Sequence, residues 1–490
     1  MTEEKHKAEA DGYLGDGVSH YPADQQKLNK YKDASIALSR FQAPVLIHSD
    51  NPNERLFIAA FDGTGNDKRT DPNHATNVAK IADDVTVLSD NGNRQIRVGY
   101  VAGPGTPKPG SQKTDAASNL DAMTGGTYNQ RTEEMYKLFI KQAAAWKTEN
   151  PNMKISVADI GFSRGAEQAA GFSRLVQERG IQDPDGAKYS YGSNGLISKV
   201  TYDKPPLVKP GETAQAVGLF DPVGTGKPVW LEDRRLPPSV ISGFQIIADD
   251  ERRGLFKSDH IIKPGATPDG RFLAVNVAGA HSDVGGSYHR DGLAVRSNNL
   301  MSDYLNGLSD KPFLEKRAES NDPRLNVIHR SDEGNMLYTL TPKINRLEPG
   351  GYNERLAPKI HFSRVVGDRN DAEPRNESLS KKFERQPVKI GAVPLTPEQA
   401  KAAQTSGLSS QLDRMLAAGK SGDHSALRAE TQALANAAPA RAMQAQAVDT
   451  VNRQEQAAAQ KTPPQALPQQ PPQQMPPQQP NPVIGGPHQH

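Results

Sequence analysis

Residues 157–166 read Val157-Ala158-Asp159-Ile160-Gly161-Phe162-Ser163-Arg164-Gly165-Ala166. The run that begins at Lys154 and closes at Ile160 is mostly apolar, which predicts a buried strand. Beyond Arg164 the residues are helix formers, and small or apolar side chains recur at helical spacing on one face. This stretch therefore predicts a strand that turns sharply into a helix, with Ser163 at the turn.

The turn carries a Gly-x-Ser-x-Gly motif, which between a strand and a helix is the nucleophile elbow of α/β-hydrolases. Such a turn is strained and lifts the serine hydroxyl above the sheet, and a side chain at Gly161 or Gly165 would crowd the passing strand and helix. The Arg164 amide, at the helix start, is expected to point at a developing oxyanion. The alternative is an ordinary tight turn between strand and helix.

Bulk composition excludes several classes of protein. The chain has 490 residues, a formal net charge of +2 and no cysteine. The length suggests one large domain with extensions, or two domains. The charge gives no reason to expect nucleic acid as a partner, and the lack of cysteine excludes disulfides, thiolate metal sites and a cysteine nucleophile. The first twenty residues contain no apolar signal region and no run is long enough to span a membrane, so we expect synthesis without a signal peptide.

The composition predicts a catalytic domain followed by extensions. Continuous apolar runs end at Phe61, Phe220, Ala248 and Val277, as expected for a mostly parallel sheet covered by helices on both faces. We therefore predict an α/β-hydrolase-like fold with a helical and then disordered C-terminal extension. The predicted segments are a polar N-terminal extension (1–50), the catalytic domain (51–345), its extension (346–394), an Ala/Gln-rich helical segment (395–460) broken at Pro439, and a disordered Pro/Gln-rich tail (461–490).

Several segments have weaker patterns. A short helix is predicted around residues 31–41, and weak strands near 325–328, 336–340 and 359–362. Two Gly/Pro-rich stretches, Gly103–Gly126 and 181–212, are predicted as long loops that form the rim or lid of the site.

A serine nucleophile needs a base, and the base needs a carboxylate that fixes its tautomer. In α/β-hydrolases the acid and then the histidine follow the serine along the chain, at strand ends. Asp221 ends an apolar strand, and of the twelve histidines only His281 directly follows a strong core strand in a turn-rich loop after the serine. Asp283 is the second choice of acid. The alternatives are a turn-initiating aspartate before proline and a loop histidine that caps its own turn.

The second oxyanion donor is expected in the loop Asp62-Gly63-Thr64, which follows an early core strand. The amides of Gly63 and Thr64 are the candidates, while Asp62 is expected to tie the turn together by accepting backbone amides. The acidic and basic run at residues 249–253 could bind a metal, but an ion-paired turn is the favoured interpretation. No metal or cofactor is predicted.

Several separated motifs occur together in a fixed order. They are Phe61-Asp62-Gly63-Thr64-Gly65-Asn66, Thr76-Asn77-Val78, Gly161-Phe162-Ser163-Arg164-Gly165-Ala166, Phe220-Asp221-Pro222-Val223-Gly224, Asp250-Glu251-Arg252-Arg253 and His281-Ser282-Asp283-Val284-Gly285-Gly286. This set resembles the α/β-hydrolase catalytic domain of the type VI secretion lipase effectors, the Tle phospholipases. The resemblance implies a Ser163–Asp221–His281 triad and phospholipase A or esterase chemistry. Pro222 departs from the family, which more often has threonine there, and puts the position of the Asp221 carboxylate in question.

The resemblance also implies partners and a location. The substrate is expected to be a phospholipid or another ester at a membrane surface, with a secretion adaptor or an immunity protein as protein partners. The protein is expected to be made in the bacterial cytoplasm and secreted by a specialised system into a target cell. Two other functions stay open, namely a carboxylesterase on a non-lipid ester and a non-catalytic hydrolase-fold module whose tail recruits a partner.

Overall fold

The computed structural model describes residues 7–106, 115–334, 336–358, 365, 367–421 and 423–436. The chain divides into two compact units, Met1–Thr396 and Pro397–His490. Among the described helices, none is long and apolar enough to cross a membrane.

The first unit is built on a seven-stranded sheet in the order β11-β12-β9-β8-β5-β3-β4. Every neighbouring pair is parallel except β11 with β12. Strands β3, β8 and β9 are buried along their whole length, because helices cover both faces of the sheet. The predicted α/β fold with a mostly parallel sheet is thus confirmed. The strands are β3 Glu54–Phe61, β4 Ile96–Val101, β5 Lys154–Phe162, β8 Gln215–Phe220, β9 Val240–Ala248, β11 Gly265–Ala266 and β12 Phe272–Val277.

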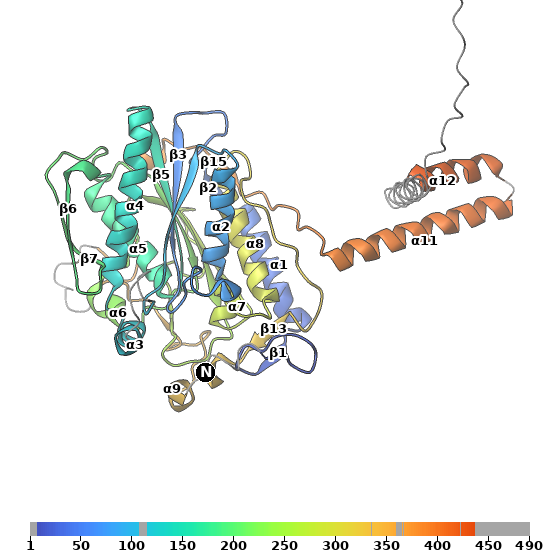
Figure 1. The fold of residues 1–490 in the computed structure, drawn as a ribbon, viewed down its shortest axis with the longest axis horizontal. Helices are drawn as coiled ribbons and strands as arrows, with labels where there is room; N and C mark the ends of the chain where they lie inside the picture. Colours follow the sequence, from blue (N-terminus) through green and yellow to red (C-terminus); the bar gives the residue numbers. More distant parts are fainter. Residues whose placement is uncertain are drawn as a thin grey trace, which may run out of the picture. The chain divides into compact units, whose positions relative to one another are not determined.

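Two layers of helices enclose the sheet (Figure 1). Helices α4 (Tyr128–Glu149) and α5 (Arg164–Arg179) cover one face, where Phe139 of α4 packs between the rings of Phe57 and Phe172. The other face is covered by α1 (Gln25–Arg40), α2 (Asn77–Asp90) and α8 (Gly292–Asn306).

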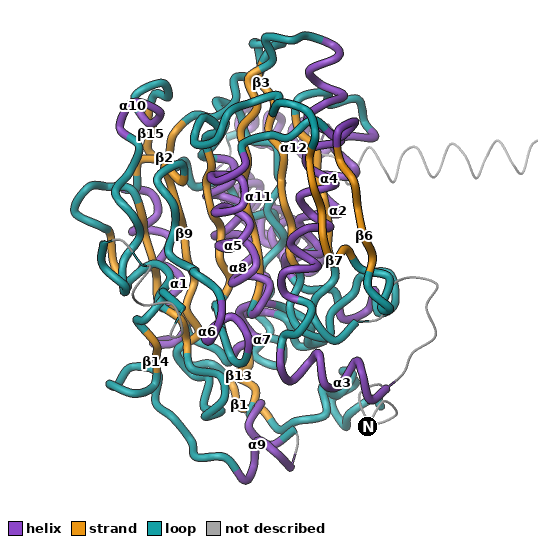
Figure 2. The backbone as a smooth tube through the Cα atoms, turned by 90° about the vertical axis from the view of Figure 1, so that its left-hand side faces the viewer, coloured by secondary structure: helices purple, strands orange, loops and turns teal. Residues whose placement is uncertain are grey.

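Four short helices lie together at one end of this unit (Figure 2). They are α3 (Asp115–Thr124), α6 (Lys227–Leu231), α7 (His281–Gly285) and α9 (Met336–Leu340). This is the end at which the parallel strands finish, because α7 follows β12 and the side chain of Arg164, one residue beyond the β5 turn, reaches the backbone of α3. Side chains at the strand ends therefore meet beneath these helices.

The remaining elements are short. Antiparallel pairs join β1 (His20–Pro22) to β13 (Val327–His329) and β2 (Gln42–Pro44) to β15 (Arg385–Pro387), while β10 (Ser258–Asp259) pairs in parallel with β14 (Tyr352–Asn353). One further helix, α10, spans Glu377–Ser380, and three 3-10 turns span Pro72–His74, Pro184–Gly186 and Ser331–Glu333.

The structure corrects several predictions from the weaker patterns. Helix α1 begins at Gln25 because the carboxylate of Asp24 caps it, accepting from the Lys27 amide at 2.8 Å. The predicted loop Gly103–Gly126 contains α3, and the predicted loop 181–212 contains the hairpin of β6 (Ala187–Tyr191) and β7 (Ile197–Tyr202). Residues 336–340 form helix α9 rather than a strand. The predicted strand at 359–362 lies outside the described residues.

The second unit contains α11 (Pro397–Ser421) and α12 (His424–Asn436), which pack against each other. Arg414 on α11 pairs with Glu430 on α12, with an Nε–Oε1 distance of 2.8 Å. The two helices divide near Asp423, whose carboxylate accepts the Ala426 amide at 2.9 Å and so caps α12. The predicted break at Pro439 and the tail 461–490 lie outside the described residues.

A buried carboxyl group in the central strand predicts how stability depends on pH. Asp159 lies between Ala59 and Val217 on the neighbouring strands, and its two carboxyl oxygens are buried without a partner among the described residues. Burial raises the pKa of Asp159 well above its ordinary value, so the folded state keeps this proton when the unfolded chain has lost it. Its contribution to stability is therefore complete below about pH 4 and declines as the pH rises towards the folded pKa.

We expect Asp159→Asn to unfold at a temperature a few degrees above the wild type at pH 8 and to differ little from it at pH 4. Thermal unfolding of both proteins across this range gives the difference directly. A difference that is the same at both pH values would contradict a neutral, buried Asp159.

Candidate active site

Ser163 occupies a strained turn between β5 and α5. Its backbone has φ 59° and ψ −127°, in a region that residues other than glycine rarely adopt. Its amide donates to the Phe220 carbonyl at 3.0 Å, and its carbonyl accepts the Ala166 amide at 3.0 Å. The turn is thus fixed both to the neighbouring strand β8 and to the first turn of its own helix.

The two glycines of the motif lie where no side chain fits. A Cβ atom at Gly161 would lie 2.2 Å from the Gly165 carbonyl oxygen, and one at Gly165 would lie 2.3 Å from the Phe61 carbonyl oxygen. Both clashes are with backbone, which cannot move aside as a flexible side chain can. The close approach of β3, β5 and α5 at this point therefore requires glycine at both positions.

Asp221 follows β8, next to the Ser163 turn. It has φ 40°, and its buried carboxylate has three donors. Oδ1 accepts the Ala248 amide at 3.0 Å and Nη1 of Arg346, while Oδ2 lies 2.6 Å from Nδ1 of His281. Pro222 therefore does not turn the carboxylate away from the histidine. Burial alone would raise the pKa of Asp221, but the charge of Arg346 and the bond with His281 outweigh it and hold the pKa below its ordinary value.

His281 is the first residue of α7 and lies above the serine turn. Its ring packs on Phe162, the residue before Ser163, with centroids 4.5 Å apart, and against Phe256 at 5.1 Å. Its amide donates to the Glu251 carboxylate at 3.2 Å. Burial lowers the pKa of His281 despite the carboxylate of Asp221, so the imidazole is neutral at neutral pH and able to accept a proton.

Serine, aspartate and histidine thus lie at the same end of the sheet. The Asp221 carboxylate accepts a hydrogen bond from Nδ1 of His281, which leaves Nε2 as the nitrogen available to a nucleophile. Within the described part of the chain, no hydrogen bond joins the Ser163 hydroxyl to His281. Hydrogen bonds of this kind are often long before a substrate is bound.

Asp283, the second choice of acid, has a different partner. Its carboxylate accepts the amides of Ala280 (2.8 Å) and His329 (3.0 Å) and lies against Nδ1 of His329. His329 also contacts Asp16, with Nε2 to Oδ2 at 3.0 Å. Burial would lower the pKa of His329, but the two carboxylates outweigh it and raise that pKa to about 9. Asp283, itself a residue of α7, therefore fixes this helix to β13 through His329. No hydrogen bond joins its carboxylate to the ring of His281 among the described residues.

The loop after β3 provides the second set of oxyanion candidates. The Gly63 amide donates to the carboxylate of its neighbour Asp62 at 2.7 Å, which takes it out of use as a donor to substrate. Burial raises the pKa of Asp62 to about 6, against hydrogen bonds from Tyr100, Thr76 and Gly63. The Thr64 amide has no partner among the described residues, and its hydroxyl is buried without one. Thr64 is thus the better candidate of the two.

The Arg164 amide is the other candidate. It has no acceptor among the described residues, and it begins α5, where the helix dipole favours negative charge. The Arg164 side chain turns away and donates to the carbonyls of Asp121 and Ala122, so it ties α3 to the turn. Neither the Arg164 nor the Thr64 amide thus has an acceptor among the described residues, as a donor to an oxyanion requires.

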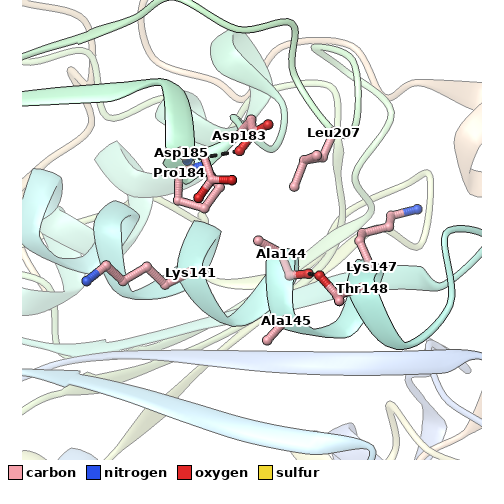
Figure 3. Close-up of a pocket in the computed structure, with 9 residues that line it drawn as sticks. All are labelled: Lys141, Ala144, Ala145, Lys147, Thr148, Asp183, Pro184, Asp185 and Leu207. Carbon is pink, nitrogen blue, oxygen red and sulfur yellow. Dashed lines mark hydrogen bonds between the residues drawn. The ribbon is translucent and has the colours of Figure 1, made fainter.

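The run at residues 249–253 forms an ion-paired turn. Glu251 pairs with Arg253 at 2.8 Å, and Asp249 and Asp250 pair with lysines of α1. No group of three or more His, Cys, Asp or Glu residues able to hold a metal ion occurs among the described residues. A cavity of about 490 Å³ between α4 and the turn at Asp183 lies elsewhere, and none of the predicted site residues lines it (Figure 3).

Arg346 was missed by the sequence analysis. It lies 125 residues beyond Asp221 in a segment without a regular pattern, and its side chain is fully buried against the candidate acid. No local signal marked it. Glu251 and Arg253 were marked as a motif, but not as neighbours of His281.

Part of the first unit matches a known protein family. Residues 55–200, which include Ser163, match the model of the T6SS phospholipase effector Tle1-like catalytic domain. Over these residues the chain is similar to that family. The resemblance drawn from the separated motifs is thereby confirmed, and the family is one of lipase-type effectors. No curated protein matches the chain.

Two solved structures are similar to this chain. An uncharacterized protein from Pseudomonas aeruginosa shares 17% identity over 63% of this chain and 51% of its own, with a TM-score of 0.32. The Tle1 effector bound to the VgrG spike of the type VI secretion system shares 21% identity over 48% of this chain and 52% of its own, with a TM-score of 0.27. The chain thus matches about half the length of each.

Proposed function

We propose that the protein is a serine hydrolase that cleaves carboxylic ester bonds of membrane phospholipids, in the manner of a phospholipase A. The observation that carries the proposal is the 2.6 Å contact between His281 Nδ1 and the buried Asp221 carboxylate, made by a histidine ring that packs on Phe162, the residue before Ser163. The match to a phospholipase effector family supports the same chemistry.

In the proposed reaction, Ser163 Oγ attacks the ester carbonyl while Nε2 of His281 takes its proton. The amides of Arg164 and Thr64 stabilise the oxyanion. Collapse of the tetrahedral intermediate breaks the ester bond, and His281 returns the proton to the leaving alcohol, a lysophospholipid. Water, deprotonated by His281, then attacks the acyl-serine, so that a fatty acid leaves and Ser163 recovers its proton.

Apolar side chains around the site favour a lipid over a soluble ester. Leu120 and Met123 on α3 are 61% and 62% exposed, and Trp230 on α6 is 54% exposed. The two helices meet, because a Cβ atom on Gly125 would lie 3.4 Å from Pro228. Of the two stretches predicted at the rim, only the first lies near Ser163, since the β6–β7 hairpin packs alongside α4.

The effector role is proposed from the family. Because one similar protein, a Tle1 effector, is bound to a VgrG spike, we include delivery on a secretion spike in the proposal. The α11–α12 unit and the Pro/Gln-rich tail are proposed as the segments that an adaptor binds, and an immunity protein is proposed to block the site in the producing cell.

Vesicles of phosphatidylethanolamine and phosphatidylglycerol test the substrate class. The purified protein is expected to release free fatty acid and lysophospholipid, measured by mass spectrometry. Hydrolysis of short soluble esters alone would instead identify a carboxylesterase, and absence of hydrolysis of either would favour the non-catalytic module.

The rim can be tested separately with the double variant Leu120→Ser, Met123→Ser. Because these side chains are proposed to enter the lipid, vesicle hydrolysis should fall by about tenfold or more while hydrolysis of a short soluble ester is unchanged. Val87→Ser is the matched control, since Val87 is 57% exposed but near the far end of α2. Equal losses on both substrates, or a similar loss in the control, would contradict a role of the rim in lipid contact.

A further inference from the structure

Arg346 is a fully buried arginine whose hydrogen bonds converge on the catalytic acid. Nη1 donates to Asp221 Oδ1 and to the Ala248 carbonyl at 3.0 Å. Nε and Nη2 both donate to the Phe256 carbonyl, at 3.1 and 2.6 Å. The side chain thus bridges the tip of β8, the end of β9 and the loop whose Phe256 ring packs against His281.

Arg346 forms an ion pair with Asp221. Its only ion pair among the described residues is with Asp221, and both side chains are fully buried. A buried guanidinium is tolerated only when it is paired and its donors are used, so the two groups depend on each other. The planar fork of arginine suits this position, because it reaches a carboxylate and two carbonyls at once.

The donors on Asp221 divide between its two oxygens. Arg346 and the Ala248 amide hold Oδ1, and this leaves Oδ2 to face Nδ1 of His281. Without Arg346, the Ala248 amide would be the one remaining donor to Oδ1 among the described residues. Because the Asp221 carboxylate is planar, the direction of Oδ2 depends on the donors that hold Oδ1.

We propose that Arg346 is a positioning residue of the triad, which fixes the Asp221 carboxylate towards His281 and offsets its charge. The proposal rests on the hydrolase function proposed above. It assigns to the segment after α9 a role in orienting the catalytic groups.

The charges around His281 give the proposal a signature that a merely structural role lacks. The groups that face the ring are Asp221, Glu251, Arg253 and Arg346, and His260 lies near Asp221. Burial lowers the pKa of His281, Asp221 raises it, and Arg253 and Arg346 lower it further. Removal of the Arg346 charge should therefore raise the pKa of His281, because the charge of Asp221 is then less compensated.

The test compares Arg346→Met and Arg346→Lys with the wild type on a short soluble ester, with rates normalised to folded protein. Arg346→Met should lower kcat by about 10- to 100-fold, with KM little changed, and move the acidic limb of the kcat/KM profile to higher pH. Arg346→Lys keeps the charge but loses the planar guanidinium. It should therefore recover part of kcat, and the acidic limb of its kcat/KM profile should lie at the wild-type pH. Arg271→Met is the matched control, because Arg271 is equally buried and donates to three carbonyls far from the triad.

A readout independent of activity separates this proposal from the proposed function. NMR titration of ring-labelled histidine, assigned with His281→Gln, should give a higher pKa for His281 in Arg346→Met than in the wild type or Arg271→Met. An unchanged His281 pKa together with an unchanged kcat in folded Arg346→Met would overturn the proposal. If the wild type hydrolyses no ester but the titration shifts as expected, the proposed function fails and the electrostatic coupling stands.

Discussion

Replacement of Ser163 by alanine is expected to reduce ester and phospholipid hydrolysis by about 10⁴- to 10⁶-fold, because it removes the hydroxyl that is proposed to form the acyl intermediate. The fold should be unaffected apart from the strained turn, whose φ of 59° is unfavourable for alanine as well. Initial rates on a p-nitrophenyl ester and on vesicles, beside circular dichroism of both proteins, measure the effect.

The chain offers a matched control for this variant. Gly171-Phe172-Ser173-Arg174 repeats the tetrapeptide of the elbow ten residues later, but Ser173 is buried inside α5 and donates to the Ala170 carbonyl at 2.7 Å. Ser173→Ala should keep wild-type activity. Activity that survives in Ser163→Ala, or is lost in Ser173→Ala without unfolding, would refute Ser163 as the nucleophile.

Asp221→Asn is expected to reduce kcat per folded molecule by about 10⁴-fold. It should also lower stability, because it leaves the buried charge of Arg346 without its ion-pair partner. The reason for the loss of kcat lies in the division of donors on this side chain. Arg346 and the Ala248 amide require an acceptor at the Oδ1 position, so an asparagine must place its oxygen there and turn its NH2 group towards His281. Nδ1 then has to accept, the ring proton moves to Nε2, and His281 can no longer take the proton of Ser163.

Asp283→Asn gives the contrasting case, since Asp283 pairs with His329 and not with His281. Its effect should be mainly on stability, because it weakens the buried contacts that join Asp283 and Asp16 to His329. The expected difference is seen in kcat per folded molecule, measured beside thermal unfolding. Near-normal kcat in Asp221→Asn with a large loss in Asp283→Asn would reverse the assignment of the acid.

The core of the fold could be predicted because parallel strands covered on both faces have a simple pattern. Strands β3, β5 and β8 are mostly apolar, and each ends in a turn with polar or glycine residues. The same pattern predicts that Ser163, Asp221 and His281 lie at strand ends. Parallel strands then bring such ends together whatever their separation in sequence.

The surface elements were missed for a related reason. The hairpin β6–β7 is mostly exposed, so its strands lack an apolar run. Its turn at Gly192-Ser193-Asn194-Gly195, between two runs rich in Tyr, Ile and Val, was the available signal. Residues 336–340 are apolar but fold as a short helix, since five residues do not distinguish a period of 2 from one of 3.6.

The long-range contacts that hold the site could not be predicted from one sequence. Arg346 contacts Asp221, which lies 125 residues earlier in the sequence. His329 contacts Asp283 and also Asp16, which lies 313 residues before it. Each is a buried charge whose partner is set by the tertiary fold rather than by local spacing. These buried residues are of the same types as charged residues on the surface, so only the structure distinguishes the buried from the exposed ones.

Covalent labelling with a fluorophosphonate probe tests the central claim most directly. The probe reacts with a serine whose proton is taken by a nearby base, and peptide mass spectrometry locates the adduct. We predict one adduct per molecule on Ser163 in the full chain, and its loss in His281→Gln. A folded wild-type protein that remains unlabelled, or that is labelled on another serine, would contradict the account.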